Sequence, residues 1–161
     1  MKTRFLVYGY GNPGRLDDGL GPALARELAE RDPTGELTVE TGYQLQVEDA
    51  ALLAGHDVVV FADADATCAA PFELRHLEPR AGLAFSTHSV APEAVLALAR
   101  EHFDCQASGF VLGIRGYEFD RFGEELSPGA RRNLAAAADY MCRALRDASL
   151  DQGGRPRRFG R

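Results

Sequence analysis

The chain has 161 residues, 45% hydrophobic and 26% charged, which is the composition of one globular domain that can bury a sizeable core. Its net charge is −6, but residues 148–161 carry a net +3 and leave −9 on the rest, which argues against a nucleic-acid partner. No apolar run approaches the roughly 20 residues that cross a bilayer, and the sequence after Met1 has no signal-peptide core. We therefore expect a cytoplasmic monomer that contacts neither nucleic acid nor membrane.

Short runs of β-branched and aromatic residues alternate with helical patterns, as they do in parallel-sheet α/β domains. This order predicts an α/β three-layer sandwich, with a mostly parallel, twisted central sheet of about five strands and helices on both faces. We expect one domain over residues 1–147 and a disordered basic tail over 148–161. The expected strands lie near residues 4–9, 36–41, 57–63, 72–77 and 109–115.

Four helices are expected between and after these strands. The first follows Asp18, a short one covers residues 46–54, and the third begins just after His88 and ends near Phe103. The last helix has the clearest start, because Ser127 is a favoured N-cap and the proline after it suits the first helical position.

The cysteines predict no special chemistry. They are odd in number, far apart and form no Cys-x-x-Cys pair, so neither a disulfide framework nor a thiolate metal site is expected. We expect core thiols at Cys68, Cys105 and Cys142.

The most informative segment is the turn after the first strand. Residues 9–21 hold five glycines and the adjacent carboxylates Asp17 and Asp18, directly before a helix. Glycines let a backbone approach a ligand closely, so chemistry at such a turn must come from the few other side chains. In an open α/β sheet this loop lies at the carboxyl edge, where these folds place their sites.

Two known patterns begin like this turn. The spacing Gly9-x-Gly11-x-x-Gly14 matches a dinucleotide fingerprint, but Pro13 removes an N–H donor and the two carboxylates would repel a pyrophosphate. Dinucleotide binding is therefore the weaker alternative. The Gly-Asn-Pro-Gly turn is also similar to that of peptidyl-tRNA hydrolases, but their histidine-bearing continuation and basic surface are missing here.

A third interpretation gives the chemistry to the carboxylates. Asp18 ends the first strand-to-helix loop, Asp63 ends the buried central strand, and His88 precedes a helix. All three positions fall at the carboxyl edge of a parallel sheet, so the side chains could converge there. Two carboxylates and one imidazole form a ligand set that suits a divalent transition metal.

Each of these residues also has a structural interpretation. Asp17 or Asp18 could cap the following helix, Asp65 could share or take the role of Asp63, and His88 could hydrogen-bond at a helix start or lie on the surface. An unpaired charge at the end of a buried strand is costly, which makes Asp63 the strongest single candidate. The remaining histidines are expected to be structural: His56, His76 and His102.

In this order and spacing, the motifs resemble those of the hydrogenase maturation endopeptidases, which process the large subunit of nickel–iron hydrogenases. The resemblance covers about residues 4–147. It rests on the glycine turn with its acidic pair, Asp63-Ala64 at a strand end, the His88 segment before a helix, and Leu126-Ser127-Pro128 at the last helix.

This resemblance implies a hydrolase, of aspartyl protease type, that removes a short C-terminal extension from the nickel-loaded large-subunit precursor. The metal-contacting positions of the family match Asp18, Asp63 and His88, and the nickel is thought to be supplied by the substrate. The metal could activate a water, or it could only position the substrate while Asp18 or Asp63 acts as a general base. A nickel chaperone that binds the same precursor without cleaving it stays open as an alternative.

Two turns are expected to contact the substrate. Many relatives carry an Asp-Gly-Gly-Thr-like loop that is associated with precursor choice, where this chain has a Thr-Gly-Tyr-Gln stretch. This difference, and the replacement of a proline-bearing segment at residues 115–120, look like the branch that serves bidirectional, NAD-linked hydrogenases. The expected substrate-contacting residues are Gly9, Gly11, Asn12, Gly42, Tyr43 and Gln44.

Overall fold

The computed structural model describes residues 2–80, 90–150 and 157–159 of the chain. Its strands are β1 (Phe5–Tyr10), β2 (Thr38–Gly42), β3 (Val58–Asp65), β4 (Phe72–Leu77), β5 (Ser108–Arg115) and β6 (Arg157–Phe159). Its helices are the 3-10 turn η1 (Leu16–Gly19), α1 (Leu20–Arg31), α2 (Asp49–Leu53), α3 (Pro92–Phe103) and α4 (Pro128–Arg146).

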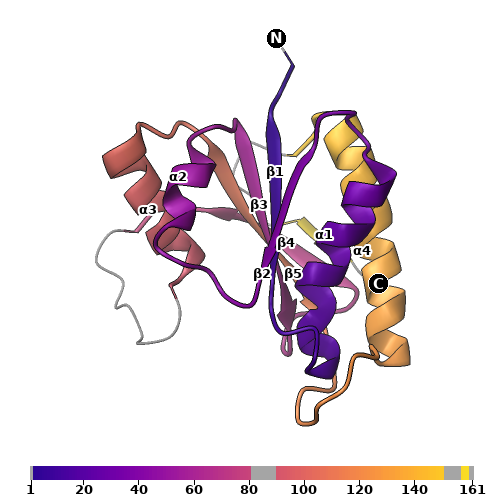
Figure 1. The fold of residues 1–161 in the computed structure, drawn as a ribbon. Helices are drawn as coiled ribbons and strands as arrows, with labels where there is room; N and C mark the ends of the chain where they lie inside the picture. The colour runs from indigo at the N-terminus through magenta and orange to yellow at the C-terminus, as the bar shows by residue number, and fades with distance from the viewer. Residues whose placement is uncertain (1, 81–89, 151–156, 160–161) are drawn as a thin grey trace.

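Within these residues the strands form one six-stranded sheet in the order β2-β1-β3-β5-β4-β6. The four strands β2, β1, β3 and β5 are parallel, whereas β4 runs antiparallel to β5, and β6 runs antiparallel to β4. Helices cover both faces of the sheet (Figure 1). The expected α/β three-layer sandwich with a mostly parallel sheet is confirmed.

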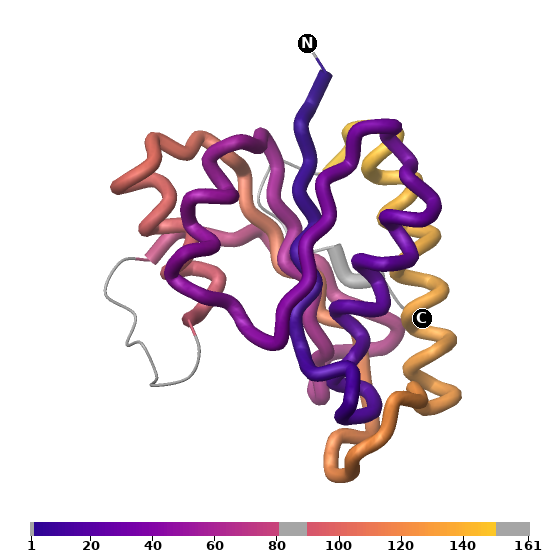
Figure 2. The backbone as a smooth tube through the Cα atoms, in the orientation of Figure 1, coloured from indigo at the N-terminus to yellow at the C-terminus, as the bar shows by residue number. Residues whose placement is uncertain are grey.

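The core has two halves because successive strand residues point to opposite faces of the sheet. Val7 and Val60 belong to the half that packs under α1 and α4, and Leu6 and Phe61 belong to the half under α2 and α3. Figure 2 shows the two helix pairs on opposite sides of the sheet. Both faces of β1 and β3 are therefore apolar, as the continuous hydrophobic runs in the sequence predict.

The connections place a reversal of the strand order between β1 and β3. From β1 the chain passes through α1 to β2 at the sheet edge, and it then returns through α2 to β3 on the other side of β1. The strand order therefore reverses between β1 and β3, and such reversal points are where open α/β sheets bind ligands. The glycine turn follows β1, and Asp63 lies near the end of β3, so both reach this point.

The first and third helices begin where they were expected, but the direction of one strand differs. The helix that follows Asp18 is α1, which starts at Leu20 directly after the 3-10 turn η1 that contains Asp18. The third helix begins at Pro92, in the stretch after His88 where it was expected. β4 runs antiparallel, which the sequence pattern of a single strand does not reveal.

Residues 157–159 were not expected to form a strand, yet they pair with β4 as β6. Most of the remaining tail lies outside the described residues, so disorder of residues 148–161 stays a prediction. No helix in the described part of the chain is long and apolar enough to cross a membrane.

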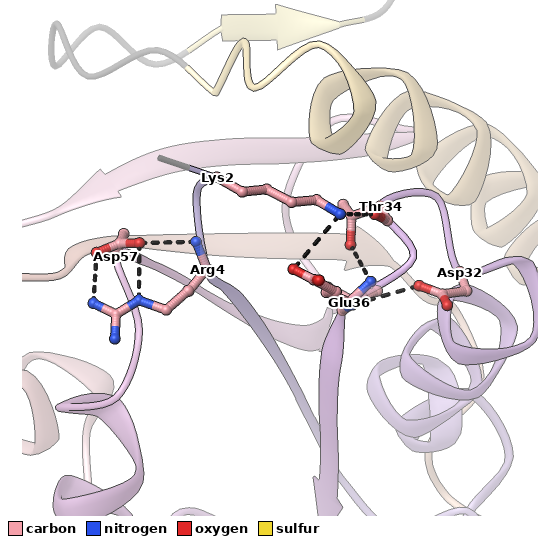
Figure 3. A network of polar contacts seen from close by, with 7 residues as sticks. Lys2, Arg4, Asp32, Thr34, Glu36 and Asp57 are labelled. Atoms are coloured by element: carbon pink, nitrogen blue, oxygen red, sulfur yellow. Dashed lines mark hydrogen bonds and ion pairs between the residues drawn. The ribbon is translucent and has the colours of Figure 1, made fainter.

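The amino ends of the strands carry a network of paired charges (Figure 3). Asp57, directly before β3, accepts three hydrogen bonds from Arg4: from its backbone N–H (2.8 Å), from Nε (3.2 Å) and from Nη2 (3.0 Å). Beside this pair, Lys2 Nζ donates to the Thr34 carbonyl at 2.7 Å and lies 3.6 Å from Glu36. Asp57 and Glu36 at this edge therefore each lie next to a cation.

Candidate functional site

The two adjacent carboxylates of the glycine turn have different environments. Asp17 is fully buried and accepts four hydrogen bonds: from the N–H groups of Tyr117 (2.8 Å), Glu118 (3.0 Å) and Ser127 (2.8 Å), and from the Ser127 hydroxyl (2.7 Å). Burial alone would raise the pKa of Asp17, but these donors lower it below its usual range. Asp17 thus ties η1 to the segment before α4.

Neither of these carboxylates caps α1. The N-cap of α1 is Gly19, and it makes no side-chain capping hydrogen bond. Ser127 is the N-cap of α4, as the sequence predicts, and its hydroxyl accepts from the Ala130 N–H at 3.3 Å. Because the same hydroxyl donates to Asp17, one serine joins the start of α4 to the glycine turn.

Asp18 is held by the turn that contains it. Its Oδ2 accepts a hydrogen bond from the Asn12 N–H at 2.8 Å, and Oδ1 of Asn12 accepts from the Gly14 N–H at 2.8 Å. These two bonds fold residues 12–14 beside the carboxylate. Asp18 is half-buried, and η1 packs against β3, so its charge acts on the end of that strand.

Asp63 is half-buried near the end of β3 and has an unusual environment for a carboxylate. Burial raises its pKa to about 7, and repulsion from Asp18 and, less strongly, from Asp65 acts in the same direction. The Ala64 N–H and the Tyr10 hydroxyl oppose the rise in part. The structure therefore brings Asp18 and Asp63 close enough for their charges to interact, and a carboxyl group with this pKa can exchange a proton near neutral pH.

Asp65 does not share the environment of Asp63. Its Oδ1 accepts hydrogen bonds from the Thr67 N–H (2.8 Å), the Thr67 hydroxyl (3.1 Å) and the Cys68 N–H (3.0 Å). Burial would raise the pKa of Asp65, but these hydrogen bonds lower it. Asp65 therefore holds the turn after β3, and Asp63 is the better candidate for chemistry.

Tyr10, at the end of β1, extends the site and was missed in the sequence. Its pKa is raised by burial and by the negative charges of Asp63 and Glu93, and its hydroxyl donates to Asp63. Glu93 lies in the first turn of α3 and forms an ion pair with Arg75 at 3.1 Å. A tyrosine in a strand is more often a core residue, so only the position of its hydroxyl reveals this role.

His88, the third expected site residue, lies outside the described residues. Among the residues that the structure describes, no group of three histidine, cysteine or carboxylate side chains is arranged to hold a metal ion. The structure thus places Asp18 near enough to Asp63 to raise the pKa of Asp63, and the shared site with His88 stays a prediction. The cysteines are buried free thiols, as expected: Cys68, Cys105 and Cys142.

Gly9 and Gly11 are needed because other segments of the backbone lie directly against them. A Cβ atom on Gly9 would overlap the Gly21 carbonyl in α1, and a Cβ atom on Gly11 would overlap the Asp18 carbonyl. Gly11 also has a φ of +140°, which favours glycine. The space beside these two residues is therefore filled by backbone, which accounts for the missing side chains without a ligand.

A pocket of about 280 Å³ lies beside the turn. It is lined from three segments, the glycine turn, α1, and the end of β2 with the residue after it: Gly11, Pro13, Pro22, Arg26, Thr41, Gly42 and Tyr43. The Gly11 N–H donates to the Gly42 carbonyl at 3.0 Å, which joins two of these segments. The side chain of Tyr43 is 73% exposed, so part of the expected substrate loop is open to a partner.

The fold is shared with known proteases. The structure is similar to a nickel–iron hydrogenase maturation protease, HycI from Thermococcus kodakarensis KOD1, with a TM-score of 0.71 and 24% identity over 89% of this chain and 93% of that one. It is also similar to the hydrogenase maturating endopeptidase HybD from E. coli, with a TM-score of 0.68 and 19% identity over 91% of this chain and 94% of that one.

A third similar structure is the hydrogenase 2 maturation peptidase from Thaumarchaeota archaeon SCGC_AB-539-E09, with a TM-score of 0.65 and 22% identity over 88% of this chain and 97% of that one. No family model matches the chain, and no curated protein sequence matches it. Identities this low show a common fold of the whole domain, and the activity must be argued from the site.

Proposed function

We propose that the chain is an endopeptidase that removes a C-terminal extension from the nickel-loaded large-subunit precursor of a nickel–iron hydrogenase. The observation that carries this proposal is the pairing of Asp18 with Asp63 at the reversal point of the sheet, where burial and mutual repulsion raise the pKa of Asp63 to about 7. The fold shared with maturation proteases over nearly the whole chain adds support.

In this proposal nickel is part of the substrate. Asp18, Asp63 and His88 complete the coordination of a nickel ion held by the precursor, which fixes the scissile peptide at the carboxyl edge of the sheet. His88 precedes α3 in the sequence, and Glu93 in the first turn of α3 lies near enough to influence the hydroxyl of Tyr10, which favours such a convergence.

Asp18 and Asp63 have different roles in this proposal. Asp18 is oriented by the Asn12 N–H and acts as a ligand of the nickel. In the alternative in which nickel only positions the substrate, Asp63 is suited to accept a proton from the attacking water as a general base, because its pKa without a bound metal is about 7. The Tyr10 hydroxyl, which donates to Asp63, holds that carboxyl group in position.

The test is to mix purified protein with nickel-loaded precursor and to follow the mass of the precursor. We expect a shortened product with the wild type, and no product with Asp63→Asn or His88→Ala if both variants melt as cooperatively as the wild type. Normal cleavage by either variant contradicts the proposed roles. A stable complex without a shortened product favours the alternative, a nickel chaperone.

Dinucleotide binding is disfavoured by one contact. The Asn12 N–H in the glycine turn donates to Asp18, so a carboxylate already occupies an amide of the kind that a pyrophosphate requires. A dinucleotide that binds the folded chain must raise its melting temperature. We expect no shift with NAD, and a clear shift would favour the dinucleotide alternative.

A further inference from the structure

The pocket beside the glycine turn carries a charge opposite to that of the domain around it. Arg26 lines the pocket and is exposed, and within the described part of the chain it makes no ion pair or hydrogen bond. Residues 1–147 as a whole carry a net charge of −9. The charge of Arg26 therefore has no partner among the described residues, and an anionic group in the pocket can pair with it even though the domain as a whole repels anions.

The other walls suit a peptide. Pro22 lies one helical turn before Arg26, so both residues face the pocket from α1. Tyr43 offers an exposed aromatic ring on the opposite side, next to Thr41. Arginine binds carboxylates through two parallel hydrogen bonds, while proline and tyrosine rings supply apolar contact area.

The pocket is also adjacent to the candidate site. Gly11 and Pro13, which line it, flank Asn12, and the Asn12 N–H is the donor that orients Asp18. A ligand in the pocket therefore lies against the same turn that positions the carboxylate.

We propose that the pocket lined by Arg26 and Tyr43 binds an acidic side chain of the peptide substrate and thereby contributes to precursor selection. This inference rests on the proposed function and names a specificity residue for it. Arg26, Thr41 and Tyr43 are all exposed, so the pocket is open to solvent and a peptide chain can continue beyond it. An internal acidic residue fits such a pocket better than a chain end does.

The direct test is binding of short peptides to isotope-labelled protein, followed by NMR. The probes are an acetylated and amidated pentapeptide, Ala-Ala-Glu-Ala-Ala, the same peptide with Gln in the centre, and the Gln peptide with a free carboxyl terminus. We expect the Glu peptide to shift the amide signals of Gly11, Gly42 and Tyr43, with an affinity about fivefold higher than that of the amidated Gln peptide.

The variant Arg26→Gln should remove this preference. Arg132→Gln is the matched control, because Arg132 is an exposed arginine of α4 outside the pocket lining, and it should keep the preference. Equal affinities for the Glu and Gln peptides, or no amide shifts up to about 10 mM peptide, overturn the inference. Tighter binding of the peptide with the free terminus overturns it as well, in favour of a pocket for chain ends.

Cleavage kinetics separate this inference from the proposed function. With the precursor, Arg26→Gln should raise KM about fivefold and leave kcat unchanged, because it removes binding that is equal in ground and transition states. If the wild type cleaves no precursor but still prefers the Glu peptide, the proposed function fails and the pocket remains. If cleavage is normal in both proteins and the peptides bind alike, only the pocket inference fails.

Discussion

The two ends of β3 present the same residue type in opposite conditions. Asp57, directly before the strand, is exposed and receives three hydrogen bonds from Arg4, which lower its pKa. Asp63, near the other end, is half-buried beside Asp18, and its pKa is raised to about 7. One carboxylate is stabilised by a cation, and the other is destabilised by burial and a second acid.

This difference separates a structural edge of the sheet from the edge that we propose to be functional. Charges at the amino edge are paired with partners of opposite sign, which costs little because the pairs stay in water. At the carboxyl edge, Asp63 lies close to other acids although the charges of Asp18 and Asp65 disfavour its ionisation. Strongly perturbed carboxylates in a crevice are typical of functional sites, since a ligand or a proton can complete them.

The largest effect on stability is expected from Asp17, which is neither paired with a cation like Asp57 nor raised in pKa like Asp63. Asp17→Ala leaves three N–H groups and the Ser127 hydroxyl without their acceptor in a buried place. We expect the free energy of unfolding to fall by about 3 kcal/mol or more, as measured by urea denaturation.

The neighbouring Asp18→Asn is its control. The amide oxygen of Asn can still accept from the Asn12 N–H, so stability should change by less than about 1 kcal/mol, while processing is lost. Equal losses of stability in the two variants would show that the acidic pair acts as one structural unit, against the division made here.

Unlike the loss of Asp17, replacement of Asp63 should stabilise the protein at high pH. Because its folded pKa of about 7 exceeds its ordinary value of about 4, the folded state binds more protons between these values, and stability falls as pH rises through that window. Asp63→Asn should remove this fall and raise the free energy of unfolding by about 2 kcal/mol at pH 8, with little change near pH 4. Urea denaturation of both proteins at pH 4 and pH 8 measures this difference. If the variant is less stable than the wild type at pH 8, the pKa of Asp63 is not raised.

The smallest effect on stability is expected from a substitution of Asp57. Its pKa is lowered, so its contribution is present above about pH 4 and is lost as pH falls below that value. Asp57→Asn should destabilise the protein by less than about 1 kcal/mol at pH 7, and high salt should shrink the difference because the pair with Arg4 is exposed. Thermal melts of both proteins at low and high salt measure this difference. A larger loss of stability that salt does not change would mean that the ion pair of Asp57 with Arg4 is not exposed to solvent.

Much of the fold follows from local patterns. The apolar run that forms β3 and the Ser127 start of α4 were predictable because strand and cap signals lie in neighbouring residues. The position of Asp63 at the end of a buried strand followed from the same run. By contrast, β6 was missed because a short polar segment carries no alternation, and the direction of β4 depends on pairing with β5.

The site was predictable only in part, because its contacts join distant segments. Asp17 and its partner Ser127 are 110 residues apart, so the sequence could not tell which of the two acids is buried. The glycines suggested room for a ligand, but the space beside Gly9 and Gly11 is filled by the chain itself. Tyr10 carries no signal that distinguishes it from an ordinary core tyrosine.

The most direct test of the central claim uses one preparation of Asp63→Asn at pH 8. Its melting temperature and its cleavage of nickel-loaded precursor are measured beside those of the wild type. If Asp63 is kept at an energetic cost for catalysis, the variant melts at a higher temperature and produces no shortened precursor. A lower melting temperature together with normal cleavage would contradict the account, because Asp63 would then be an ordinary stabilising residue.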